Sequence, residues 1–355
     1  MEEAALRPDF VTEKRKITVN TINMKIRLYS TLSILAAGVV GLIAGPALTP
    51  MLPVNIVGAH GAFDFTGVDP VHRHLLLCHA DNDSLDVVNL DTSTLIQSIP
   101  LGAAQGVAVD TNNNRYYVSI STPPGLVTVD ASSLKVIATL PLPEETDLIG
   151  YHPGLNRVYV CNRKKPEVWV VDPVTQKILA TIHLPGGGME ELCFDASGKF
   201  LFQGIRNDSH LAKVDLSDNT VLTNYSTMPI KAPHGIVRIP GSDVALIAGK
   251  NGISGLVSLE TGKVIATTVT PTKIDQLAYD ADLHQAYAVS SSGSLVVMSI
   301  NHDQLTTVTN IPCAPGADGI SVDPKNHSVW IAYDKDGKSY FQKFEVDAAR
   351  LPKLN

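Results

Sequence analysis

The sequence predicts an all-β protein, a seven-bladed β-propeller made of four-stranded antiparallel blades. Short apolar runs alternate with period two, turn-forming residues separate these runs, and the pattern recurs every 41 to 44 residues. One unit is clearest in residues 105–142, where turn formers at 111–114, 123–125 and 131–133 separate four strand-like runs. A single sheet of this size buries too little apolar surface to be stable, so each unit needs neighbours on both sides.

The residue that ends the first strand of each unit locates the copies. It occurs at seven positions: Asp69, Asp110, His152, Asp195, Ile239, Asp280 and Asp323. The polar residue that ends the third strand keeps the same register: Asp91, Asp130, Asp172, Asp215, Glu260, Asn301 and Asp347. Seven all-strand units of about 40 residues are typical of a propeller rather than a solenoid.

Residues 1–47 are predicted to be an N-terminal extension followed by a secretory signal. Lys25 and Arg27 precede the apolar run 32–43, and small residues lead to a cleavage site after Ala47. Met24 begins a complete signal by itself and is an alternative start. The apolar run is shorter than the ~20 residues of a spanning helix, so removal is expected rather than retention as a membrane anchor. We therefore expect a periplasmic or extracellular protein whose residues 48–355 form one propeller domain.

The composition limits the kinds of partner and the cysteine chemistry that we expect. The formal net charge is −7, and no run of more than three lysines and arginines follows the first thirty residues. Nucleic-acid binding through phosphate neutralisation is therefore not expected. The four cysteines are dispersed over different units without a CxxC pair, so we expect buried, unpaired thiols: Cys78, Cys161, Cys193 and Cys313. We also expect a monomer.

Two motifs carry a family resemblance. The third unit contains YVCN at 159–162 and the second contains YVS at 117–119. The hairpins at 171–182 and 258–269 share an acid, a turn, a lysine, branched residues and Ala-Thr. These segments resemble the YVTN repeat of the YncE-like seven-bladed propellers, with Cys161 and Ser119 in place of the motif threonine. The resemblance covers about residues 64–347. It implies an exported propeller and no catalytic residues, because members share a scaffold rather than one chemistry.

Polar residues precede each marker by five positions, where the innermost strands enter the central channel. They are Asp64, Gln105, Asp147, Glu190, His234, Asp275 and Asp318. Seven-fold geometry brings them into a ring, here called the ring residues. Like charges in a narrow mouth must share protons, pair with bases or bind a cation. The six ring residues other than Gln105 could hold Ca²⁺ or another divalent cation. The alternative is a water-filled polar funnel in which the acids cap first-strand N–H groups.

Basic residues end several second strands on the same face: His79, Arg163, Arg206 and Lys250, with Asn162 and Asn207 beside two of them. Arg163, Arg206, Lys250, Asn162 and Gln105 are therefore candidates for binding a small anionic ligand, unless the bases only pair with the ring acids. His60 can also reach the mouth. Four further histidines are expected to be solvated on the opposite face: His72, His74, His284 and His327.

Two functions follow from this mouth. The first is an exported binding module that engages a small ligand or a partner protein. The second is a metal-dependent enzyme of the lactonase or lyase type, with an axial cation as Lewis acid and His234 or His79 as acid or base. The diffuse motifs favour binding.

For ring closure, the stretch PVNIVG at 53–58 is expected to pair as the outermost strand of blade seven, because residues 348–355 lack strand alternation.

Overall fold

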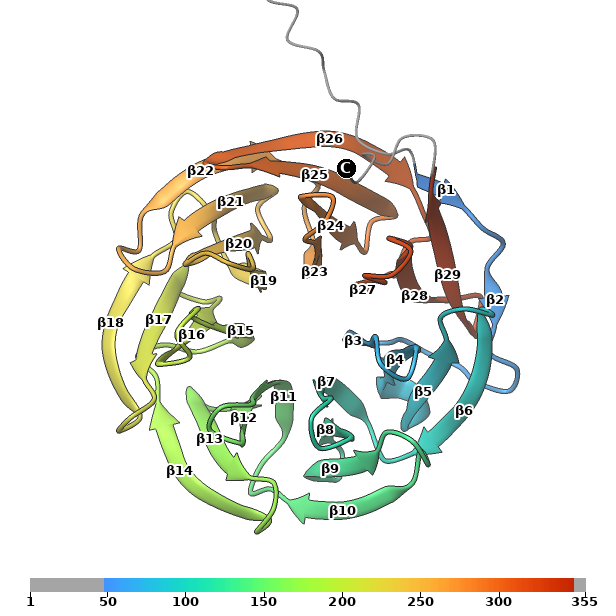
Figure 1. Cartoon of the computed structure of the whole chain (residues 1–355), viewed down its shortest axis with the longest axis horizontal. Coiled ribbons are helices and arrows are strands. Elements are labelled where there is room, and N and C mark those ends of the chain that lie inside the picture. The colour runs from blue at the N-terminus through green and yellow to red at the C-terminus, as the bar shows by residue number, and fades with distance from the viewer. Residues whose placement is uncertain (1–47, 348–355) are drawn as a thin grey trace, which may run out of the picture. The chain divides into compact units, whose positions relative to one another are not determined.

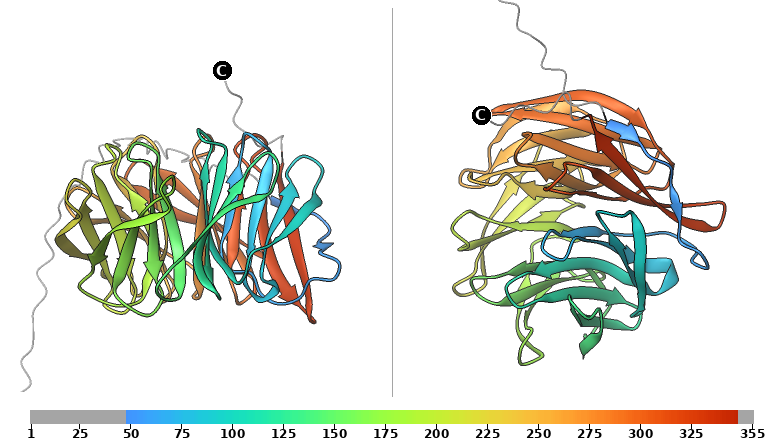
Figure 2. Two further views of the ribbon diagram at one scale, coloured as in Figure 1. Left: turned by 90° about the horizontal axis from the view of Figure 1, so that it is seen from below. Right: turned by 45° about the vertical axis from the view of Figure 1, so that its right-hand side comes forward.

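The computed structural model describes residues 48–347, which form seven antiparallel sheets arranged as the blades of a propeller (Figure 1). The predicted fold class is confirmed. In the side view the blades stand next to one another around the ring (Figure 2). The predicted secretory signal and the alternative start at Met24 lie outside the described residues. Within the described part, no helix is both long and apolar enough to cross a membrane.

In blades one to six the first strand lies nearest the axis and the last lies at the rim, whereas in blade seven an N-terminal strand lies at the rim (Figure 1). Blade one contains β3 (Thr66–Asp69), β4 (His74–His79), β5 (Ser84–Asn89) and β6 (Thr94–Pro100), with a short 3₁₀ turn at Ala80–Asn82. Blade two contains β7 (Ala104–Asp110), β8 (Arg115–Ser121), β9 (Pro124–Asp130) and β10 (Val136–Pro141). Blade three contains β11 (Thr146–His152), β12 (Arg157–Asn162), β13 (Glu167–Asp172) and β14 (Lys177–His183). Blade four contains β15 (Met189–Phe194), β16 (Phe200–Ile205), β17 (His210–Asp215) and β18 (Thr220–Ser226).

The remaining blades follow the same order. Blade five contains β19 (Pro233–Arg238), β20 (Val244–Gly249), β21 (Ile253–Ser258) and β22 (Val264–Val269). Blade six contains β23 (Ile274–Asp280), β24 (Gln285–Ser290), β25 (Ser294–Asn301) and β26 (Gln304–Pro312). Blade seven contains β27 (Gly319–Val322), β28 (Val329–Lys335) and β29 (Lys338–Val346), completed by β1 (Leu48–Pro50) and β2 (Val54–Asn55).

Burial follows position in the blade. Second and third strands such as β12 and β13 are almost continuously buried, because both of their faces pack against neighbouring blades. Outer strands such as β22 alternate between half-buried and exposed residues. The apolar clusters between blades contain the largest fully buried side chains, with Trp330 and Tyr116 among them. This inter-blade packing is the stabilising contact that the isolated repeat lacks.

N-terminal residues close the ring, as predicted, but only part of the predicted stretch pairs and residues 48–50 pair as well. Leu48, Thr49 and Pro50 pair with the C-terminal half of β29, from Val346 back to Phe344. Of the predicted stretch 53–58, β2 pairs only Val54 and Asn55 with β29. Ile56 adds a backbone hydrogen bond to Ser339 O and a buried side chain. β2 ends at Asn55 and Val57 lies in a turn, so the stretch is not one continuous strand.

The face opposite the ring residues differs from the prediction of solvated histidines. His74 lies in β4 and is buried, with Nδ1 2.8 Å from the Tyr116 hydroxyl. His72 and His327 are partly buried and each pairs with an aspartate. His284 alone of the four is exposed. The prediction failed because these positions face the adjacent blade, which a single repeat does not reveal. The four cysteines are free; Cys313 is partly exposed and the other three are buried.

Candidate functional site

The structure contains a polar cavity of about 450 Å³ at the channel mouth. Six ring residues line it: Asp64, Asp147, Glu190, His234, Asp275 and Asp318. Arg163, Arg206 and Lys250 line the same cavity, together with Lys164. Phe63, Leu148 and Met189 add apolar surface that the sequence reasoning missed.

Local irregularity in the first strands positions the ring side chains. The antiparallel register shifts within β7, β11, β15, β19 and β23, and in each strand the shift spans the ring residue. A bulge inserts an unpaired residue and re-aims its side chain. In blades one and seven, Asp64 and Asp318 precede shorter first strands that begin at Thr66 and Gly319. The bulges therefore place polar side chains where regular pairing would have continued.

A chain of charged contacts runs around half of the mouth. Arg206 Nη1 lies 2.7 Å from Glu190 Oε1, and His234 Nε2 lies 2.9 Å from Glu190 Oε2. His234 Nε2 is also 3.3 Å from Asp275 Oδ1, which in turn pairs with Lys250. Two of the predicted bases therefore neutralise ring acids, which was the alternative to ligand binding.

Arg163 behaves differently from the other two bases. Its guanidinium donates to Oε1 of Gln105 and makes no ion pair within 4.0 Å among residues 48–347. Gln105 is itself buried and does not line the cavity. Arg163 is thus the cationic group at the mouth that keeps donor capacity for a ligand.

Burial raises the pKa of several of the mouth acids. Burial, together with the nearby Asp147, raises the pKa of Asp64 well above its usual range. Burial raises the pKa of Asp147 to about 6 against the opposing charge of Arg163. Burial and the adjacent Asp275 raise the pKa of Asp318 to about 7. The crowded carboxyls therefore relieve repulsion partly by protonation and partly by pairing with bases.

Asn162 and His79 do not occupy the mouth. Asn162 is buried, and its Oδ1 accepts hydrogen bonds from the backbone N–H groups of Lys164 and Lys165. His79 is fully buried, with Nδ1 2.6 Å from Asp86 Oδ2 and Nε2 3.0 Å from Ser339 Oγ. The placement of His79 at the mouth was wrong, because its side chain turns into the contact between blades one and seven. His60 is exposed and outside the cavity lining.

The ring acids were expected, as one alternative, to accept hydrogen bonds from first-strand N–H groups. In two blades the residue directly after the ring residue accepts such a bond instead. Glu191 Oε2 accepts the N–H of Ile236 at 2.7 Å, from the next blade. At the equivalent position of blade six, Gln276 Oε1 accepts the N–H of Ile320 at 3.0 Å. Burial raises the pKa of Glu191 to about 8, so near neutrality it resembles the uncharged Gln276. The consecutive Glu190-Glu191 pair was the available signal, but the bulge that separates their directions is not visible in the sequence.

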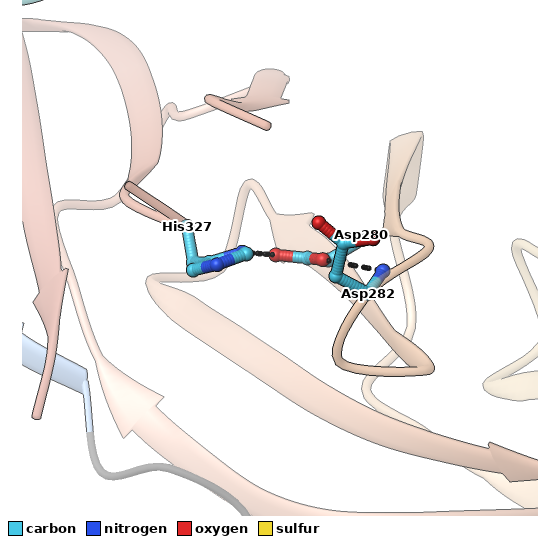
Figure 3. Close-up of side chains that lie close together, drawn as sticks. All are labelled: Asp280, Asp282 and His327. Carbon is cyan, nitrogen blue, oxygen red and sulfur yellow. Dashed lines mark hydrogen bonds and ion pairs between the residues drawn. The ribbon is translucent and has the colours of Figure 1, made fainter. Parts of the chain in front are cut away.

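Metal-ligand geometry differs between the two faces. Within residues 48–347, one group of three side chains brings its ligand atoms within 4.8 Å of one another: Asp280, Asp282 and His327 (Figure 3). No trio of ring residues in that range does so. The ring acids approach bases or each other in pairs instead. A cation held by the ring residues stays a prediction.

Comparisons with known proteins identify the fold. No family model matches the chain, and no curated protein matches its sequence. Many solved structures resemble it, three of which are the following. U3-55K matches with a TM-score of 0.72 and 10% identity, over 83% of this chain and 98% of that one. The WD40 repeats of RRP9 match with a TM-score of 0.73 and 11% identity, over 85% and 99%. Kuenenia stuttgartiensis hydrazine synthase matches with a TM-score of 0.68 and 14% identity, over 83% and 100%. Similarity at these identities supports the propeller fold and no shared activity.

Proposed function

We propose that this protein is an exported binding module whose channel mouth receives a small anionic ligand. The observation that supports it most directly is the set of four cationic side chains around one cavity of about 450 Å³: Arg163, Lys164, Arg206 and Lys250. That volume lies within the range of small-molecule sites. Burial there also disfavours the charged form of several carboxyls, which reduces the negative charge that an anion meets.

Arg163 is the proposed anchor. Its guanidinium can turn from the neutral Gln105 to a ligand carboxylate or phosphate without exposing an unpaired buried acid. Arg206 and Lys250 would each have to share a donor that already contacts Glu190 or Asp275. The pKa of Asp318 is raised to about 7, so below that pH its carboxyl supplies a hydrogen-bond donor to the same anion. Phe63, Leu148 and Met189 provide apolar contact for the remainder of the ligand.

The proposal is tested with a panel of anions of different charge: acetate, succinate, citrate and inorganic phosphate. Isothermal titration calorimetry on the protein would compare wild type with Arg163→Gln. We expect at least one probe to bind and its affinity to fall about tenfold or more in the variant, as for loss of a charge-assisted contact. Lys165→Gln is the matched control, because Lys165 lies on the same loop, pairs with Glu144 and does not line the cavity.

Absence of binding to every probe would overturn the small-anion proposal and favour a partner protein as the occupant of this face. Equal losses in Arg163→Gln and Lys165→Gln would show general surface attraction rather than a site. The observations favour the binding proposal over the enzyme alternative with His234 or His79 as acid or base. His79 is buried outside the mouth, and His234, which lines the cavity, contacts Glu190 and Asp275. The ring places no three ligand atoms together in the described part.

A further inference from the structure

A second group of ionisable side chains lies at the junction of blades six and seven, on the face opposite the ring residues. Asp280 ends β23, Asp282 follows in the next turn, and His327 lies in the turn between β27 and β28 (Figure 3). Their ligand atoms all lie within 4.8 Å of one another. Two adjacent blades thus contribute to one cluster, and none of its members takes part in the channel mouth.

The neighbouring junction, between blades seven and one, shows how the fold neutralises acids at this position. Arg73 occupies the turn position that His327 occupies in blade seven, four residues after the marker, with φ values of 59° and 62°. Arg73 Nη1 lies 2.6 Å from Asp323 Oδ1, and Arg73 Nη2 lies 2.9 Å from Asp91 Oδ1. Lys325 also approaches Asp91, at 3.4 Å. Two carboxylates there face two permanent cations.

At the junction of blades six and seven, the positive charge is smaller. Asp280 is buried; one oxygen accepts two turn N–H groups at 3.1 Å and the other lies 2.7 Å from His327 Nδ1. The exposed Asp282 carboxylate has no hydrogen bond or ion pair with any other residue of 48–347. No lysine or arginine of that range pairs with either carboxylate. Two acids therefore share a single imidazole, where the sister junction has a guanidinium and an ammonium.

We propose that Asp280, Asp282 and His327 bind a divalent transition-metal ion of the zinc class. Two carboxylate oxygens and one imidazole nitrogen form a three-ligand set that leaves a fourth position for water, a coordination zinc commonly adopts. The imidazole and the small number of oxygens disfavour Ca²⁺ and Mg²⁺, which require six or more oxygen ligands. The ion takes the place of the hydrogen between His327 Nδ1 and Asp280 Oδ2, and the imidazole ligates through Nδ1 as the neutral tautomer that carries its proton on Nε2. It links blade six to blade seven, as Arg73 links blade seven to blade one.

Co²⁺ is used to detect binding at this site by its visible absorption, and Zn²⁺ is used to measure the binding affinity. Titration of the chelator-treated full chain with Co²⁺ should give visible d–d absorption that saturates at one ion per chain, and Zn²⁺ should displace it. Asp282→Asn removes a ligand from an exposed side chain and should weaken Zn²⁺ binding at least tenfold. His327→Arg copies the arrangement of Arg73, so the variant should fold with an unchanged or higher melting temperature and bind no cobalt.

The control uses the chain's other close histidine–aspartate pair on this face. His72 Nδ1 lies 2.7 Å from Asp69 Oδ2, the same distance as in the proposed site, but this pair is not part of a three-ligand group in the described residues. His72→Gln should therefore leave cobalt absorption and zinc affinity unchanged. The proposal is overturned if wild type gives no saturable absorption, or if Asp282→Asn and His327→Arg bind zinc as tightly as wild type does.

Discussion

Nε2 of His234 lies 2.9 Å from Oε2 of Glu190, and this contact joins the first strands of blades five and four at the channel mouth. The same nitrogen faces Asp275 of blade six at 3.3 Å. One imidazole therefore bridges carboxylates from both neighbouring blades. The mouth is a coupled set of groups from successive blades, so its charge depends on pH as a whole rather than residue by residue.

Anion binding should strengthen as the pH falls. The carboxyls of Asp147 and Asp318 take up protons near neutrality, with pKa values of about 6 and about 7, and burial also raises the pKa of Asp64, whereas Arg163 stays charged. From about pH 8 to about pH 5.5 we expect the affinity for the best anion probe to rise several-fold. Calorimetry in buffers of different ionisation enthalpy should show proton uptake. Cation binding at the ring would show the reverse trend, with proton release.

Asp147 should make the folded state less stable at alkaline pH. Its folded pKa is raised from 3.8 to about 6, so its favourable contribution is complete below about pH 4 and is lost as the pH rises through about 6. Asp147→Asn removes this titration. We expect the variant to unfold at a higher temperature than wild type at about pH 8, with a smaller difference at about pH 5. Equal differences at both pH values would contradict the assignment.

Glu191 should tolerate glutamine but not alanine. Its raised pKa keeps the side chain largely uncharged near neutrality, and Gln276 already fills the equivalent position in blade six. Glu191→Gln should therefore be as stable as wild type at about pH 6 and more stable at about pH 9, where the wild-type carboxyl ionises. Glu191→Ala leaves the N–H of Ile236 without its acceptor and should cost roughly 1–3 kcal/mol. Urea unfolding at the two pH values separates these outcomes.

Ring closure should depend on β1 and β2 rather than on the loop residues beside them. A chain that begins at Ile56 lacks both strands, and we expect its melting temperature to be several degrees below that of a chain beginning at Leu48. Leu52 is 88% exposed, so Leu52→Ser serves as the control and should change little. Identical melting temperatures for the two truncated chains would show that the ladder to β29 contributes no stability.

The fold could be predicted from the sequence because each repeat contains its own strand pattern and turns. The positions of Asp147 and Glu190 at the mouth follow from the repeat spacing alone, since equivalent residues of a closed array share one radius. The direction of His79 does not follow, because it depends on contacts with Asp86 in its own blade and Ser339 in blade seven.

Other differences between prediction and structure have the same physical origin. β1 reads Leu-Thr-Pro and has no alternation, since its pairing with β29 is set by the free edge of blade seven rather than by its own side chains. Bulges next to ring residues such as Glu190 arise from a mismatch between two strands, which one strand's sequence does not encode. The pairing of His327 with Asp280 spans two repeats and becomes visible only when the blades are placed side by side.

Because Leu48 pairs with Val346, the ring can close only after β29 has been synthesised. The ribosome makes β1 before any blade, yet its partner β29 is made only after the strands of blades one to six. Pairing between segments so distant in the chain is slow to form. Until then β1 has no partner strand, and blade seven cannot be complete. A chain that is released or cleaved before β29 can still form six blades. In such a chain β1 and β2 have no partner strand, and their free backbone groups can pair with a strand of another molecule.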